Sequence, residues 1–239
     1  MGQALVKQDK PQTPLSSEPG LAAVASSSDA LPALGDLRFQ SLLGAKAWRQ
    51  LPLAIRQRFS KRLVGGAAAI YRGELVAMRM SIAGKILAQL LRLVGAPLPL
   101  SVDEHVPSVV TVTEDKPSGG QVWTRLYANH HGFPQVIHSA KRFAGHTGLE
   151  EYLGFGLAMA LRVEAAPDAL LFHSAGYVWR CGRLELRIPR WLEPGSLLVE
   201  HRDCAQEHGE GAFLFALTLK HPWLGELVHQ AGIYREASS

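Results

Sequence analysis

The sequence predicts an α+β protein that is mainly β: a curved or barrel-like antiparallel meander sheet of about eight or nine strands, with N-terminal helices packed on it. The chain has 239 residues, of which 47% are hydrophobic, so it can bury a full core. After about residue 107, apolar strand-like runs alternate with short connectors rich in Gly, Pro and Asn. Connectors this short cannot hold crossover helices, and neighbouring strands should therefore be antiparallel.

The N-terminal segment, residues 1–35, has a different composition from the rest of the chain. It is rich in Ser, Ala and Pro and shows no apolar period. Such a segment buries too little apolar surface to offset the entropy lost on ordering. We expect a disordered tail here and a single domain over residues 36–239.

Two stretches before the sheet have helical periodicity. Between residues 38 and 63, apolar side chains recur at spacings of three and four, with Pro52 suited to the first turn of a second helix. A second apolar stripe predicts a helix over residues 82–94, with Ser81 as its N-cap and Gly95 as its stop. Both segments are expected to pack on the sheet.

The strands of the predicted sheet follow from period-two alternation, β-branched and aromatic residues, and flanking turn residues. The connectors are short and contain glycine or proline, as hairpins require. The predicted strands are residues 70–80, 109–114, 121–128, 135–143, 151–164, 169–181, 197–204, 212–220 and 227–235.

The segment over residues 149–164 has two apolar faces of different size. Alternation along this predicted strand places bulky side chains on one face and glycines and alanines on the other, so both faces must be covered. The small face allows close approach of another backbone, and the helix over residues 82–94 is one candidate to pack there. Alternatively, the small face forms the floor of an apolar ligand pocket. The candidate ligand-binding residues are Trp123, Arg142, Gly154, Phe155, Gly156, Leu157 and Met159.

The densest group of polar residues lies on two successive predicted strands. Alternation places His138 and Arg142 on one face of their strand and Lys141 on the other, and a hairpin would bring these residues near Glu151. Cross-strand ion pairs on a solvated face would explain the pattern. Alternatively, the group forms the polar end of the pocket, where His138, Lys141 and Glu151 are candidate acids, bases or anion anchors.

Charge and motifs exclude several classes of function. The net charge of +4 is concentrated between Arg49 and Arg62, either as a solvated helix face or as a contact for an anionic lipid or phosphate. No zinc-finger spacing or RNA-binding motif indicates nucleic acid, and no phosphate-binding loop, dinucleotide fingerprint or metal-ligand motif occurs. No segment predicts a transmembrane helix or signal peptide. We therefore expect a cytoplasmic protein without a metal or cofactor.

Several runs of the sequence resemble a known family. They include "GGQVWTRLY" at residues 119–127, "FPQVIHSAKRFAGHTGLEEYLGFGLAMALRV" at 133–163 and "HPWLGELVHQAGIYR" at 221–235. Over about residues 38–236 the chain resembles the bacterial family described as domain of unknown function 4166. Members also occur fused behind reductase domains similar to saccharopine dehydrogenase, so this chain resembles the stand-alone form. The resemblance implies a possible reductase partner but no established activity or catalytic residues.

Three hypotheses about function remain open from the sequence. The first is a module that binds a hydrophobic or amphipathic small molecule, such as a lipid, in an apolar pocket. The second is a cofactor-independent enzyme, or the accessory domain of a reductase system. The third is an adaptor that uses its basic helix at a membrane surface.

Overall fold

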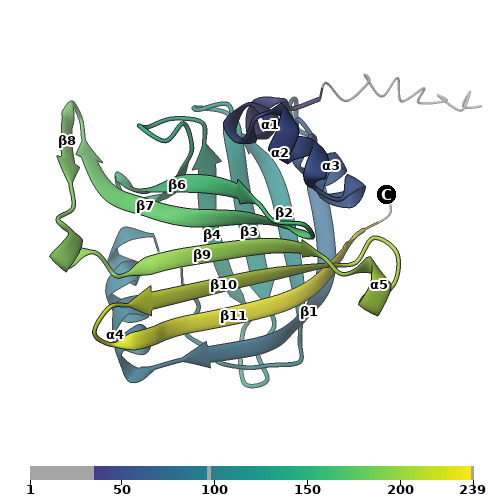
Figure 1. Cartoon of the computed structure of the whole chain (residues 1–239). Coiled ribbons are helices and arrows are strands. Elements are labelled where there is room, and N and C mark those ends of the chain that lie inside the picture. Colours follow the sequence, from purple (N-terminus) through teal and green to yellow (C-terminus); the bar gives the residue numbers. More distant parts are fainter. Residues whose placement is uncertain (1–34, 96–97, 238–239) are drawn as a thin grey trace, which may run out of the picture. The chain divides into compact units, whose positions relative to one another are not determined.

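The computed structural model describes residues 35–95 and 98–237, and almost all of the predicted tail lies outside these ranges. The described part of the chain forms one sheet of eleven strands (Figure 1). The strands are β1 (Ala69–Met80), β2 (Val106–Asp115), β3 (Gly120–Tyr127), β4 (Gln135–Arg142), β5 (Glu150–Gly154), β6 (Leu157–Ala165), β7 (Ala169–Cys181), β8 (Leu184–Arg187), β9 (Ser196–Asp203), β10 (Phe213–His221) and β11 (Gly225–Glu236).

The sheet closes into an antiparallel barrel. Strands β1 to β7 pair in chain order, β7 continues to β9, and β10 and β11 complete the meander. The barrel closes where β11 pairs with β1, from Tyr71 opposite Glu236 to Met80 opposite Val228. Ten strands form the ring, and β8 is an extra strand that pairs only with the second half of β7. The predicted fold class is confirmed, with more strands than the sequence indicated.

The predicted strand over residues 151–164 is wrong, because the chain folds there into a hairpin. β5 ends at Gly154, β6 begins at Leu157, and the intervening turn has φ values of +120° at Gly154, +45° at Phe155 and +83° at Gly156. A Cβ atom on Gly156 would lie 1.9 Å from the backbone oxygen of Arg180. The glycines therefore serve the turn and a close backbone approach, and they do not form one face of a strand.

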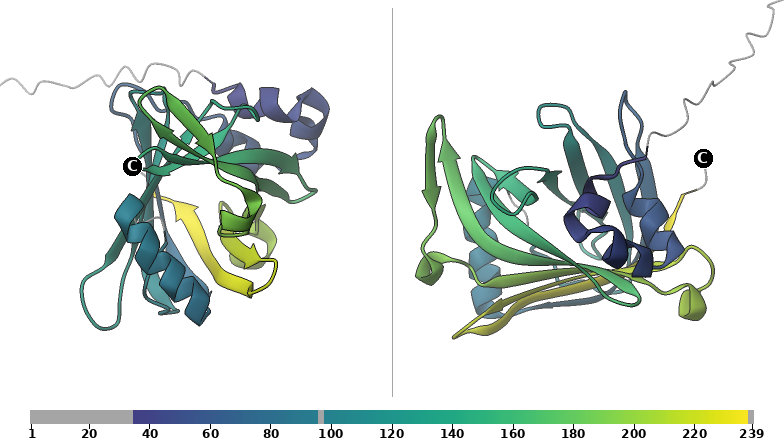
Figure 2. Two further views of the ribbon diagram at one scale, coloured as in Figure 1. Left: turned by 90° about the vertical axis from the view of Figure 1, so that its left-hand side faces the viewer. Right: turned by 45° about the horizontal axis from the view of Figure 1, so that its top comes forward.

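Three short helices, α1 (Arg38–Leu43), α2 (Ala45–Gln50) and α3 (Leu53–Phe59), lie at one end of the barrel (Figure 2). Phe39 and Phe59 are buried in the same apolar cluster as the barrel residues Trp123 and Phe172. The rings of Phe39 and Phe59 meet edge to face at 5.1 Å. The helices therefore cover this end with aromatic side chains.

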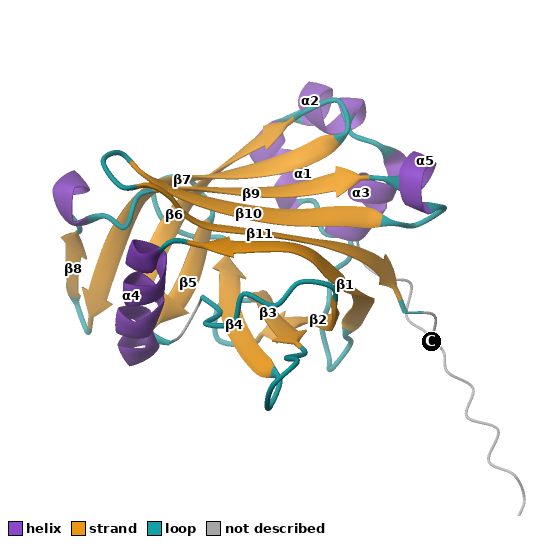
Figure 3. Cartoon of the chain, turned by 90° about the horizontal axis from the view of Figure 1, so that it is seen from below, coloured by secondary structure: helices purple, strands orange, loops and turns teal. Residues whose placement is uncertain are grey.

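Helix α4 (Ile82–Leu91) lies beside the start of β11 (Figure 3), and the short 3-10 helix η1 (Arg92–Val94) continues it. The predicted cap is confirmed, since the Ser81 hydroxyl accepts a hydrogen bond from the N–H of Gly84 at 3.1 Å. A Cβ atom on Gly84 would lie 2.1 Å from the backbone oxygen of Leu227, so α4 packs directly on β11. Two short helices that were not predicted complete the described elements: η2 (Arg190–Leu192) and α5 (Ala205–His208).

The basic stretch between Arg49 and Arg62 does not form one solvated face. The Arg58 guanidinium lies 3.5 Å from the ring centroid of Phe213, and Lys61 is paired with Glu236. These two cations are engaged within the molecule. Over residues 35–95 and 98–237, no helix has the length and apolar character needed to cross a membrane.

Candidate functional site

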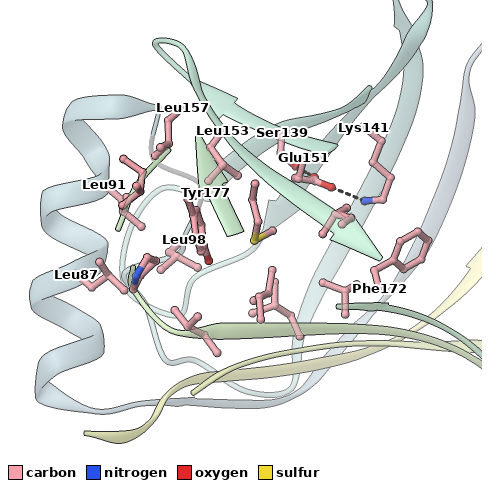
Figure 4. Close-up of a pocket in the computed structure, with 18 of the residues that line it drawn as sticks. Leu87, Leu91, Leu98, Ser139, Lys141, Glu151, Leu153, Leu157, Phe172 and Tyr177 are labelled. Carbon is pink, nitrogen blue, oxygen red and sulfur yellow. Dashed lines mark hydrogen bonds and ion pairs between the residues drawn. The ribbon is translucent and has the colours of Figure 1, made fainter. Parts of the chain in front are cut away.

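An apolar cavity of about 290 Å³ lies inside the barrel, with α4 at one end (Figure 4). Helix α4 contributes Leu87 and Leu91, whereas its residues Ile82, Ile86 and Leu90 are exposed. The helix borders the cavity and does not fill it. The other lining residues are Leu98, Arg125, Ser139, Lys141, Glu151, Leu153, Leu157, Met159, Leu161, Phe172, Tyr177, Ile188, Leu192, Pro194, Leu197, Val199, Leu217 and Leu219.

Strand alternation explains which side chains face the cavity. Successive residues of a strand point to opposite faces, so Ser139 and Lys141 of β4 both point inward. On β6, Leu157, Met159 and Leu161 do the same. The leucine-rich walls make the site suitable for an apolar molecule.

A buried polar cluster forms part of the wall. The Lys141 ammonium lies 2.8 Å from the Glu151 carboxylate, and the Ser139 hydroxyl donates a hydrogen bond to the same carboxylate. Arg125 lies farther away, with a guanidinium nitrogen 3.9 Å from Glu151. Because strands β3, β4 and β5 are neighbours, these side chains meet at one place in the barrel. The cluster gives the apolar cavity a single charged region.

The environment shifts the pKa values of the ion pair. Burial lowers the pKa of Lys141, and the Arg125 charge adds to this effect, while Glu151 opposes it. Burial alone would raise the pKa of Glu151, but the cations of Lys141 and Arg125, with two hydrogen bonds, lower it below its ordinary value. The carboxyl of Glu151 is therefore ionised at neutral pH.

Lys141, Glu151, Leu157 and Met159, all candidates from the sequence, line the cavity. Trp123 is buried but does not line the cavity, and the Lys141 ammonium lies 4.9 Å from its ring centroid. The structure thus brings Leu157 and Met159 together with two of the three candidate acids, bases or anion anchors.

The other candidates lie away from this cavity. His138, Arg142, Gly154 and Phe155 line a larger but shallower hollow of about 710 Å³ on the outer face of the sheet. Arg142 bonds Asp115 there at 2.8 Å. The barrel wall separates His138 from the cavity-lining side chains of Lys141 and Glu151.

Two polar residues of the cavity, Arg125 and Ser139, were missed as candidates from the sequence. Arg125 lies between Trp123 and Tyr127 at period-two spacing, so three successive inward positions of β3 read aromatic, cationic, aromatic. A cation at an inward position between two aromatic residues was the available signal. For Ser139 the available signal was its spacing of two residues from Lys141, which places both side chains on the same face of β4.

Among the described residues, no three or more His, Cys, Asp or Glu side chains are grouped so that they could hold a metal ion. The cavity contains one carboxylate, and that group is already bonded to Lys141 and Ser139. The side chains that line the cavity thus offer apolar contact, the charged groups of this one cluster and the hydroxyl group of Tyr177.

Comparison with known proteins agrees with the resemblance seen in the sequence. The family described as "Domain of unknown function (DUF4166)" matches residues 51–233. This match covers β1 to β10 and most of β11. No curated protein matches the sequence. Because the family match spans most of the chain, including the whole cavity, the protein belongs to the domain of unknown function 4166 family.

Proposed function

We propose that this protein is a binding module for a hydrophobic or amphipathic small molecule, held in the barrel cavity. The observation that supports this most directly is the cavity of about 290 Å³ inside the barrel, with predominantly aliphatic walls. Protein interiors pack densely and leave few voids larger than a water molecule. A cavity of this size, lined by leucines and bordered by a helix, has the character of a small ligand site.

Binding of an apolar chain would be driven by the hydrophobic effect. Each buried methylene group contributes about 0.8 kcal/mol, from which the cost of immobilising the ligand is subtracted. The aliphatic side chains that face the space, such as Leu87, Leu157 and Leu217, would surround such a chain on several sides. A medium-length alkyl chain suits the volume.

The enzyme hypothesis is less well supported by the geometry. It relied on His138, Lys141 and Glu151 acting together, and His138 lies on the outer face of the barrel. The remaining pair is engaged, since Lys141 and Glu151 bond each other. A general base needs an available acceptor close to the substrate proton. A binding role requires no such group.

A titration with n-octanol tests the proposal. Isothermal titration calorimetry measures the binding. The expected result is saturable binding of one n-octanol molecule per protein chain. Leu157→Trp, which adds bulk at a half-buried cavity position, should weaken binding about tenfold or more. Leu126→Trp is the matched control, because Leu126 is 36% exposed on a neighbouring part of the barrel and does not line the cavity. Absence of binding, or equal binding by Leu157→Trp and the unaltered protein, would contradict the proposal.

A further inference from the structure

The buried cluster in the cavity wall holds more positive than negative charge. Arg125 and Lys141 are cations, and Glu151 is the only carboxylate among the cavity-lining residues. His201, which is fully buried nearby, adds no negative charge, and its pKa is lowered well below its ordinary value by burial and by the neighbouring cations. The cluster therefore has a surplus of one positive charge.

Other buried acids do not compensate for this surplus. The remaining buried carboxylates of residues 35–95 and 98–237 are Asp36, Asp115 and Glu150. Each is bonded to a partly exposed arginine: Asp36 to Arg38, Asp115 to Arg142 and Glu150 to Arg180. These three carboxylates are neutralised by their own arginine partners, so they do not neutralise the surplus positive charge in the cavity wall.

The surplus is concentrated on Arg125, because Lys141 already has a close carboxylate partner. Only 9% of the Arg125 side-chain surface is exposed. Its two terminal nitrogens reach the Ser139 hydroxyl at 3.5 Å, the outer limit of a hydrogen bond, and the Glu151 carboxylate at 3.9 Å. Its Nε is buried with no hydrogen-bond partner in the described part of the chain.

A guanidinium has five N–H donors, and burying it without close acceptors is costly. Lys141 and Glu151 bond at 2.8 Å, whereas Arg125 has no contact of this kind. An anionic group entering the cavity would supply the missing acceptor and neutralise the surplus charge. A cavity whose charges balanced would offer the same anion no such net attraction to offset the cost of its desolvation.

We propose that the ligand is an amphiphile with a single anionic headgroup, such as a carboxylate, which binds Arg125 while the alkyl chain lies along the leucine-lined part of the cavity. This inference rests on the proposed binding function and adds the class of ligand. Both ends of such a molecule find matching surroundings within one cavity, since Arg125 and the α4 residues Leu87 and Leu91 all line it.

The test compares three ligands of equal chain length on the unaltered protein: octanoate, n-octanol and octylammonium at pH 7.5. Octanoate should bind about ten- to a hundredfold more tightly than n-octanol, because a hydrogen bond to a charged group contributes that much. Octylammonium should bind most weakly. This comparison needs no variant, so it does not depend on the folding of an altered protein.

Arg125→Met then identifies the group responsible. The octanoate affinity should fall about tenfold or more relative to the n-octanol affinity of the same variant, so that the preference for octanoate is lost. Arg72→Met, at an exposed arginine of β1 outside the cavity, is the matched control and should keep the preference for octanoate.

The outcomes separate this inference from the proposed function. If n-octanol binds and octanoate binds no more tightly, or if Arg125→Met keeps the preference, the headgroup assignment is overturned while the binding function stands. If none of the three ligands binds the unaltered protein, both are overturned.

Discussion

The ammonium nitrogen of Lys141 lies 2.8 Å from a carboxylate oxygen of Glu151 inside the barrel, where the two side chains are only 2% and 9% exposed. Desolvating two charges costs several kcal/mol per ion, and close pairing offsets this cost. The pair is also part of the cavity wall. The same two residues therefore bear on the stability of the protein and on the charge of the cavity wall.

Glu151→Gln should destabilise the protein strongly. The substitution leaves the buried cations of Lys141 and Arg125 without a carboxylate, and breaking a buried pair in this way costs about 3–5 kcal/mol. Urea unfolding followed by circular dichroism measures the free energy of unfolding. The double variant Lys141→Met, Glu151→Leu should recover only part of the loss, since it removes both charges of the pair but still leaves the buried Arg125 without a carboxylate.

Glu185→Gln is the control for Glu151→Gln. Glu185 is exposed and pairs with Arg180 at 2.7 Å, and an ion pair at the surface contributes little. Its unfolding midpoint should stay close to that of the unaltered protein. Equal effects of the two substitutions would show that the buried pair has no special role.

His201→Phe should stabilise the protein. The fully buried His201 ring lies among aromatic rings, with the centroid of Phe59 at 5.0 Å and that of Phe215 at 5.2 Å. Both ring nitrogens are buried without a hydrogen-bond partner among the described residues. Removing two unsatisfied polar atoms should raise the free energy of unfolding at pH 7.5 by about 1 kcal/mol or more.

The same substitution should remove part of the acid sensitivity. Burial, with the cations of Lys141, Arg58 and Arg125, lowers the pKa of His201 well below 6.5, so only the unfolded chain takes up this proton as the pH falls below about 6.5. The unaltered protein should lose up to about 1.4 kcal/mol per pH unit there from this group, and His201→Phe should not. His138→Phe, at an exposed histidine, should keep the slope. If His201→Phe left the pH dependence of the free energy of unfolding unchanged, His201 would not be the source of the acid sensitivity.

Gly84→Val should displace α4 from the barrel. A Cβ atom at this position would lie 2.1 Å from the backbone oxygen of Leu227, and a backbone atom cannot move away easily. Amide hydrogen exchange across residues 82–91 should become faster. Gln89→Val, at an exposed position of the same helix, is the matched control and should show only the small effect of a β-branched residue. Unchanged exchange in Gly84→Val would show that the close contact does not hold the helix.

Local sequence patterns predicted the fold class and most of the elements. Alternation and short connectors indicated an antiparallel meander, and Ser81 with the following apolar stripe correctly marked the start of α4. Closure of the barrel depends on pairing between β1 and β11, the first and last strands of the described chain. Such long-range pairing leaves no local signature.

The errors in the site have an equally physical cause. Gly154, Phe155 and Gly156 stand between apolar runs, and a period-two pattern passes through them without a break, so the hairpin turn was not evident. Because β5 ends and β6 begins at this turn, the alternation of side chains between the two faces does not continue through it. The sequence placed Lys141 near Glu151 because the two residues lie on the two strands of one hairpin, where they pair directly. The position of Arg125 beside this pair is evident only in the folded sheet, where β3 lies next to β4.

Methionine-methyl NMR gives the most direct test of the account. Among the four methionines, Met159 lines the cavity, whereas the buried Met78 does not. In a titration with octanoate, the Met159 methyl resonance should shift saturably and show nuclear Overhauser contacts to the alkyl chain, with a much smaller change at Met78. A Met159 resonance that stays fixed, while octanoate either fails to bind or binds elsewhere, would contradict the claim that the barrel interior is the ligand site.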